Sequence, residues 1–144
     1  MTRVLIVCTG NSARSQMAEG LLRHDAGRHF EVASAGTSPI PVRPEAIRVM
    51  QELGIDISGH RSKSVAEFAG QAFDIVLTVC DHARETCPVF PGGVRRVHRG
   101  FEDPGNVPGS AGQRLDAFRR VRDELRAWLR EFAAAVTEGR GLSS

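Results

Sequence analysis

Short apolar runs alternate along this chain with segments whose apolar residues recur every three or four positions. The first run, from Val4 to Val7, is continuous and mostly β-branched, which is typical of a strand buried on both faces. A loop of small residues follows it, and then a helical pattern from Ser15 to Ala26. Strands that alternate with helices in this way predict a parallel sheet covered by helices on both faces.

The same alternation continues to the end of the chain. We expect further strands at residues 30–35, 73–79 and 94–98, and helices at 44–53, at 64–72 and from Ser110 onward. In the last helix Gln113 completes a capping box with Ser110, and an apolar stripe follows. That stripe consists of Leu115, Phe118, Val121, Leu125, Leu129, Phe132 and Val136. The expected fold is α/β: a single domain over residues 1–144 with a four-stranded parallel sheet, and a frayed tail from about residue 138.

The composition limits where the protein works and what it binds. A length of 144 residues suits one domain, and a net charge of +2 is too small to indicate a nucleic-acid partner. No apolar stretch is long enough to span a bilayer, and the run from Val4 to Val7 is too short for the core of a signal peptide. We therefore expect a cytoplasmic protein that binds neither nucleic acid nor a membrane. Because no spare apolar stripe is evident, we also expect a monomer.

The chain has three cysteines, Cys8, Cys80 and Cys87. An odd number in a reducing compartment does not suggest a framework of structural disulfides. Such thiols are usually catalytic, redox-active or metal-binding, although they can also be small buried hydrophobic residues. Cys80, His82 and Cys87 could ligate zinc, but their spacing is irregular and no fourth ligand is evident, so we predict no metal site.

Cys8 stands at the carboxyl end of the first expected strand, where ligands bind in parallel α/β sheets. Backbone N–H groups of a small-residue loop, with the amino end of the next helix, can cradle an oxyanion. Arg14 adds a planar fork of donors, and the same positive field favours the thiolate of Cys8, to which Ser15 could donate a hydrogen bond. The residues expected to bind the oxyanion are Thr9, Gly10, Asn11, Ser12, Ala13, Arg14 and Ser15. The segment is not a Walker loop. The alternative interpretation is an ordinary strand–helix turn with a buried cysteine.

The segment "CTGNSARSQMAEG" resembles the phosphate-binding loop of the low-molecular-weight protein tyrosine phosphatase superfamily. Further along, "DIVLTVCDHARETCP" and "GFEDP" resemble the thioredoxin-coupled arsenate reductases that share that fold. The similarity runs from Val4 to about Phe132. It implies an arsenate reductase that serves arsenic detoxification, with thioredoxin as its reductant and phosphate as a competing analogue of arsenate.

The resemblance also implies roles for individual residues. Cys8 matches the nucleophile that attacks arsenate, Arg14 the residue that holds the oxyanion, and Asp103 the general acid. Cys80 and Cys87 match two relay thiols, so oxidation would pass from Cys8 to Cys80 and then to Cys87. For that transfer the segment between the relay thiols must be mobile, helical when reduced and looped out when oxidised. Asn11 matches the residue that holds the loop in shape.

The chain departs from these relatives at two positions. Many relatives have a second cysteine in the loop, where this chain has Ala13. Some relatives bind potassium through Asn, Glu, Ser and Asp side chains. Asn11, Glu19 and Ser34 match three of them, but Lys63 stands where the Asp would be. We therefore expect no cofactor, and we expect the lysine to take the place of the ion.

Two other functions remain open from the sequence. A phosphatase for phosphotyrosine or small phosphate esters would need the loop and Asp103 but has no use for the two further cysteines. The absence of tyrosine, and Gly105 after the Asp-Pro pair, disfavour an aromatic substrate. A non-catalytic oxyanion sensor or carrier would need the loop alone.

Overall fold

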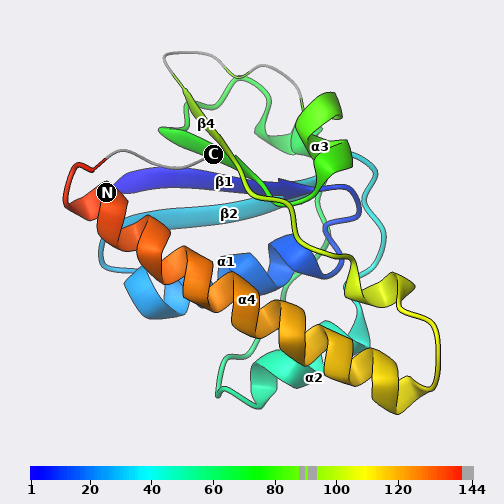
Figure 1. The fold of residues 1–144 in the computed structure, drawn as a ribbon. Coiled ribbons are helices and arrows are strands. Elements are labelled where there is room, and N and C mark those ends of the chain that lie inside the picture. Colours follow the sequence, from blue (N-terminus) through cyan, green and yellow to red (C-terminus); the bar gives the residue numbers. More distant parts are fainter. Residues whose placement is uncertain (88–89, 91–93, 141–144) are drawn as a thin grey trace.

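A computed structural model of the chain describes residues 1–87, 90 and 94–140 (Figure 1). Four strands form one parallel sheet in the order β2-β1-β3-β4. The strands are β1 (Thr2–Cys8), β2 (Phe30–Gly36), β3 (Ile75–Thr78) and β4 (Arg95–His98). The helices are α1 (Arg14–Ala26), α2 (Pro44–Gln51), α3 (Asp81–Thr86) and α4 (Ala111–Thr137), with single 3-10 turns η1 (Val65–Phe68) and η2 (Pro104–Asn106). The predicted fold class is confirmed.

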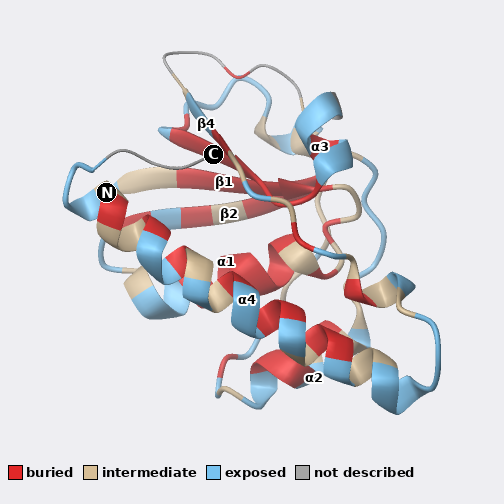
Figure 2. Cartoon of the chain, in the orientation of Figure 1, coloured by how far each residue is buried: buried red, intermediate tan, exposed pale blue. Residues whose placement is uncertain are grey.

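The sheet brings the carboxyl ends of its strands to one edge. Cys8 at the end of β1 pairs with Gly36 at the end of β2, and Val7 pairs with Thr78 at the end of β3. The central strands are buried without interruption, from Val4 to Cys8 in β1 and throughout β3, so both of their faces are covered (Figure 2). The apolar run at the start of the sequence is therefore the centre of the core.

The helix α4 packs along α1 through the apolar stripe that the sequence predicts. Five residues of this stripe are buried: Phe118, Val121, Leu125, Leu129 and Phe132. Leu115 and Val136, at the two ends, are half-buried. The predicted capping box is present, because the Gln113 backbone N–H donates to Ser110 Oγ (3.1 Å) and the Ser110 N–H donates to Gln113 Oε1 (2.7 Å).

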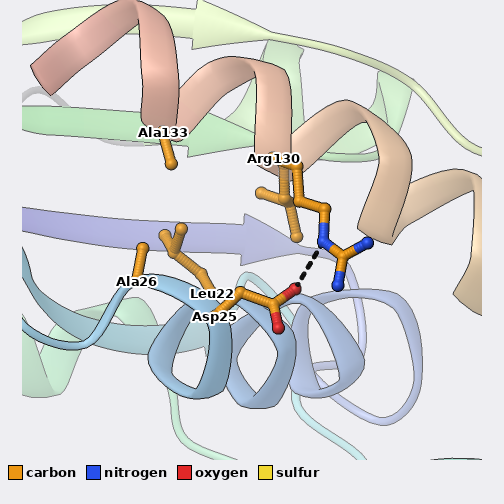
Figure 3. Close-up of a pocket in the computed structure, with 6 residues that line it drawn as sticks. Leu22, Asp25, Ala26, Arg130 and Ala133 are labelled. Atoms are coloured by element: carbon orange, nitrogen blue, oxygen red, sulfur yellow. Dashed lines mark hydrogen bonds and ion pairs between the residues drawn. The ribbon is translucent and has the colours of Figure 1, made fainter. Parts of the chain in front are cut away.

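Asp25, near the end of α1, joins α1 to α4. Its carboxylate accepts hydrogen bonds from Arg126 at 2.8 and 3.0 Å. It also accepts one from Arg130 at 3.3 Å, which Figure 3 shows. Burial alone would raise the pKa of Asp25, but the hydrogen bonds from Arg126 and His24 and the charges of Arg126 and Arg130 lower it to about 2. A hollow of about 190 Å³ lies beside Asp25 and Arg130, between α1 and α4. It is at the opposite end of α1 from the Cys8 loop.

Two elements differ from the expectation. The helix predicted at 64–72 is only the single turn η1, which Ser64 caps by accepting from the Ala66 N–H at 3.1 Å. The third strand is shorter than predicted, Ile75–Thr78. The last helix ends at Thr137, and residues 141–144 of the predicted frayed tail lie outside the described residues. Within the described ranges, no helix combines the length and the low polarity that crossing a membrane requires.

Candidate active site

The loop from Cys8 to Arg14 joins β1 to α1, and its carbonyl groups are held from outside. The segment 37–43 donates four backbone N–H groups to the loop carbonyls of Cys8, Thr9, Gly10 and Ser12, at 3.2, 2.8, 2.9 and 2.9 Å. These bonds occupy four carbonyl groups of the loop, and the Asn11 N–H of the loop donates to the Cys8 sulfur. Gly36 permits this close approach, because a Cβ there would lie 2.6 Å from the Thr9 carbonyl oxygen. The loop is therefore built to receive an anion.

The sulfur of Cys8 is buried among hydrogen-bond donors. The side chain is 2% exposed, and Sγ accepts from the Asn11 backbone N–H at 3.2 Å. Ser15 Oγ lies 2.8 Å from the same sulfur. Asn11 belongs to the loop and Ser15 to the first turn of α1. The sulfur of Cys8 therefore lies near the amino end of that helix, which carries a partial positive charge.

Asn11 holds the loop in its shape. It has a φ of +48°, a left-handed conformation that asparagine tolerates better than most residues. Its Nδ2 donates to Ser15 Oγ (2.8 Å) and to Ser34 Oγ (2.9 Å), while its Oδ1 accepts from Gln16 Nε2 (3.0 Å) and from the Lys63 backbone N–H (2.9 Å). With the amide held on both sides, Ser15 Oγ accepts from Asn11 and its own proton is free for Cys8.

Glu19 lies beneath this network with 5% exposure. Ser34 Oγ donates to its Oε1 at 2.6 Å, and the Arg23 guanidinium lies 2.8 Å from its Oε2. His60 Nδ1 is 3.6 Å from Oε2, and burial lowers the pKa of His60 while Glu19 opposes the shift. A buried carboxylate therefore directs the protons of Ser34 and, through Asn11, of Ser15.

Lys63 stands where a cation would be expected beside Glu19. Its Nζ lies 4.0 Å from Glu19 Oε1 and donates to the Arg61 carbonyl oxygen at 3.1 Å. Burial lowers the pKa of Lys63, and the Glu19 charge opposes this. Because the ammonium group already lies beside that carboxylate, the residues present do not fit a potassium site. Across the described ranges, His, Cys, Asp and Glu side chains form no group of three that could hold a metal ion.

Arg14 and Asp103 meet above the loop. Arg14 Nη1 donates to the Phe101 carbonyl oxygen at 3.0 Å, and its Nη2 lies 3.7 Å from Asp103 Oδ2. Asp103 also accepts from the Gly105 N–H at 2.9 Å, so it caps η2. Its side chain is 36% exposed against 14% for Arg14. The carboxyl group of Asp103 is thus the more exposed partner of this pair.

The other two thiols stand at the two ends of α3. Cys80 precedes the helix, is 3% exposed, and has its Sγ 3.3 Å from Thr9 Oγ1. Cys87 follows the helix and is half-buried; burial raises the pKa of its thiol, while Arg96 opposes the shift. All three cysteines are free thiols, so the helical 81–86 segment is the form expected for the reduced protein.

The sequence did not reveal every residue around the loop. Gln16 Oε1 accepts from His60 Nδ1 at 2.9 Å, and Ser62 Oγ donates to the Asn11 carbonyl oxygen at 2.8 Å. Gln16 lies inside the motif and could have been singled out there. Ser62 is 51 positions from its partner and carries no local signal.

The chain is similar to several known proteins. The family described as low molecular weight phosphotyrosine protein phosphatase has a model that matches residues 3–141. An arsenate reductase of Halalkalibacterium halodurans is 42% identical over 130 residues, which is 90% of this chain and 94% of the relative. A solved arsenate reductase in the phosphate binding state is 32% identical with a TM-score of 0.71, covering 93% of this chain and 98% of that one. A thioredoxin-dependent arsenate reductase of Corynebacterium glutamicum is 26% identical with a TM-score of 0.74, covering 97% of this chain and 63% of that one.

Proposed function

The chain belongs to the low molecular weight phosphotyrosine protein phosphatase family, and from this premise we propose that it reduces arsenate to arsenite. The loop would serve a phosphatase equally well, since arsenate and phosphate share shape and charge. The observation that carries the proposal is the position of the further thiols. Cys80 contacts Thr9 of the loop, and Cys87 ends the same short helix. Ester hydrolysis uses neither.

In the first step the Cys8 thiolate attacks arsenic and forms a sulfur–arsenic bond. Arg14 and the loop N–H groups hold the oxyanion, and Asp103 gives its proton to the oxygen that leaves as water. The distances from Cys8 Sγ to Ser15 Oγ and from Arg14 to Asp103 support these roles.

In the second step Cys80 attacks the sulfur of Cys8. A sulfur–sulfur bond forms, the sulfur–arsenic bond breaks, and its electron pair stays on arsenic, which leaves as arsenite. Cys87 then attacks Cys80, which frees Cys8 as a thiolate and moves the disulfide away from the loop. Thioredoxin supplies the two electrons that reduce the Cys80–Cys87 disulfide; the thioredoxin-dependent relative supports this choice of reductant.

One sample can separate this function from its rivals. Arsenite release is measured with and without thioredoxin, thioredoxin reductase and NADPH, and hydrolysis of p-nitrophenyl phosphate is measured in parallel. We expect about one arsenite per enzyme without the reductant and continuous release with it. Ester hydrolysis without any arsenite would make the chain a phosphatase. Arsenate binding with neither reaction would make it an oxyanion carrier.

A further inference from the structure

We infer that Asp81 and His98 form a latch that holds α3 against the sheet and sets when Cys80 and Cys87 can join. The inference rests on the thiol relay of the proposed function, and it assigns two positioning residues to that relay. Neither residue contacts the oxyanion loop.

Two hydrogen bonds link three side chains in a row from the sheet to α3. Thr78 Oγ1, at the end of β3, lies 2.8 Å from His98 Nδ1, and His98 Nε2, at the end of β4, lies 2.8 Å from Asp81 Oδ1. A carboxylate only accepts, so Nε2 donates to Asp81, and the neutral ring then accepts the Thr78 hydroxyl proton at Nδ1. One tautomer satisfies both bonds. Gly100 leaves room for the contact, since a Cβ there would lie 2.8 Å from Asp81 Oδ1.

The helix α3, to which these hydrogen bonds lead, has little stability of its own. It has six residues, and a helix so short is marginal without tertiary contacts. The side chain of Cys80, at the N-cap position, makes no capping hydrogen bond to the helix backbone. Ala83 is fully buried against the core, and Asp81, the first helical residue, provides a polar attachment to β4. Loss of the Asp81–His98 contact would therefore remove one of the contacts that hold the start of α3 against the sheet.

The relay requires this helix to open. An α-helix rises about 1.5 Å per residue, so Cα atoms seven positions apart, such as those of Cys80 and Cys87, are separated by roughly 10 Å along an intact helix. A disulfide needs Cα atoms about 4.4–6.8 Å apart. The second disulfide cannot form until α3 unwinds, and unwinding carries Asp81 away from His98. The closed latch keeps Cys80 beside Thr9 for the first exchange, and its release permits the second.

The test measures the opening of α3 in the reduced protein without arsenate. Hydrogen exchange of the Arg84 and Cys87 amides, which bond to the Cys80 and Ala83 carbonyls, reports the helix, and iodoacetamide labelling of Cys80 reports its exposure. We expect Asp81→Ala and His98→Ala each to raise both rates roughly two- to fivefold, as the loss of one ion pair with an exposed carboxylate would. The double variant should exceed neither single variant.

Glu85→Ala is the matched control, because it removes the same charge from an exposed position of α3 and should change neither rate. If Asp81 acted only on the helix dipole, Asp81→Ala alone would raise the rates and His98→Ala would not. That result, unchanged rates in both variants, or additive effects in the double variant would overturn the latch. Because no arsenate is used, a wild-type protein that releases no arsenite would refute the proposed function and leave this result standing.

Discussion

The hydroxyl oxygen of Thr9 lies 3.3 Å from the sulfur of Cys80. Thr9 directly follows Cys8, the proposed nucleophile, and Cys80 directly precedes α3. This contact therefore places the second thiol at the loop, although 71 positions separate the two residues. Cys87, at the far end of α3, has no such contact with the loop among the bonds of the described residues. The structure therefore favours an order of thiols that can be tested one at a time.

Each cysteine variant should stop the reaction at a different place. Cys8→Ser should bind arsenate and release no arsenite. Cys80→Ser should form the arsenic adduct without reducing it, while hydrolysis of p-nitrophenyl phosphate survives. Cys87→Ser should release about one arsenite per enzyme and stop as a Cys8–Cys80 disulfide, because the outward exchange needs a third thiol. Mass mapping after one exposure to arsenate identifies the bond. Full thioredoxin-driven turnover by Cys87→Ser would show that Cys87 takes no part.

Asp103→Asn should separate the two roles of Asp103, that of a general acid and that of the N-cap of η2. Asparagine can still accept from the Gly105 N–H, so the melting temperature should change little. Hydrolysis of p-nitrophenyl phosphate and formation of the arsenic adduct should fall by about 10²–10⁴-fold, the usual contribution of a general acid. The control is Glu102→Gln, which removes the neighbouring, exposed carboxylate that pairs with Arg120. Equal losses in the two variants would argue against a specific role for Asp103.

Lys63 should make a monovalent cation unnecessary. Since its ammonium group lies 4.0 Å from Glu19 Oε1, activity and melting temperature should be the same in potassium and in sodium chloride at equal ionic strength. Lys63→Met should lower the free energy of unfolding by about 1–3 kcal/mol, because the buried Glu19 carboxylate loses one of its cations. Arg61→Met, which removes an exposed cation nearby, should cost less. A potassium-specific gain in the wild-type protein would contradict this role of Lys63.

Asp25 should make the stability of the α1–α4 contact depend on pH. Its pKa is about 2 in the folded protein against an ordinary value of 3.8, so the ionised form is favoured by folding. The stabilisation, about 2 kcal/mol, is complete above pH 3.8 and is lost as the pH falls through the folded value. Asp25→Asn should therefore be less stable than wild type at pH 7, and the difference should shrink towards pH 2.

Urea unfolding at several pH values measures this difference. The exposed carboxylate of Glu124, on α4, provides the control. Glu124→Gln should leave the pH dependence as it is in the wild-type protein. A difference between Asp25→Asn and wild type that stays constant from pH 7 to pH 2 would mean that the ion pair does not account for it.

The sequence alone determined the elements whose signals are local. The apolar run Val4 to Val7, the helical periodicity after Ser15 and the capping box at Ser110 all depend on neighbours within a few positions, and each appears in the structure. The loop between Cys8 and Arg14 was recognisable for the same reason, since seven consecutive residues carry its chemistry.

Only the tertiary structure decided how those pieces are held and coupled. Lys63 bonds Asn11 from 52 positions away, and His98 reaches Asp81 from 17 positions away on a different element. Neither contact has a periodicity or a spacing that a sequence displays. Parallel pairing of the strands brings these residues to one sheet edge, because it gathers carboxyl ends that are far apart along the chain. The sequence thus specified the candidate nucleophile Cys8, and the sheet decided which distant groups surround it and which contact α3.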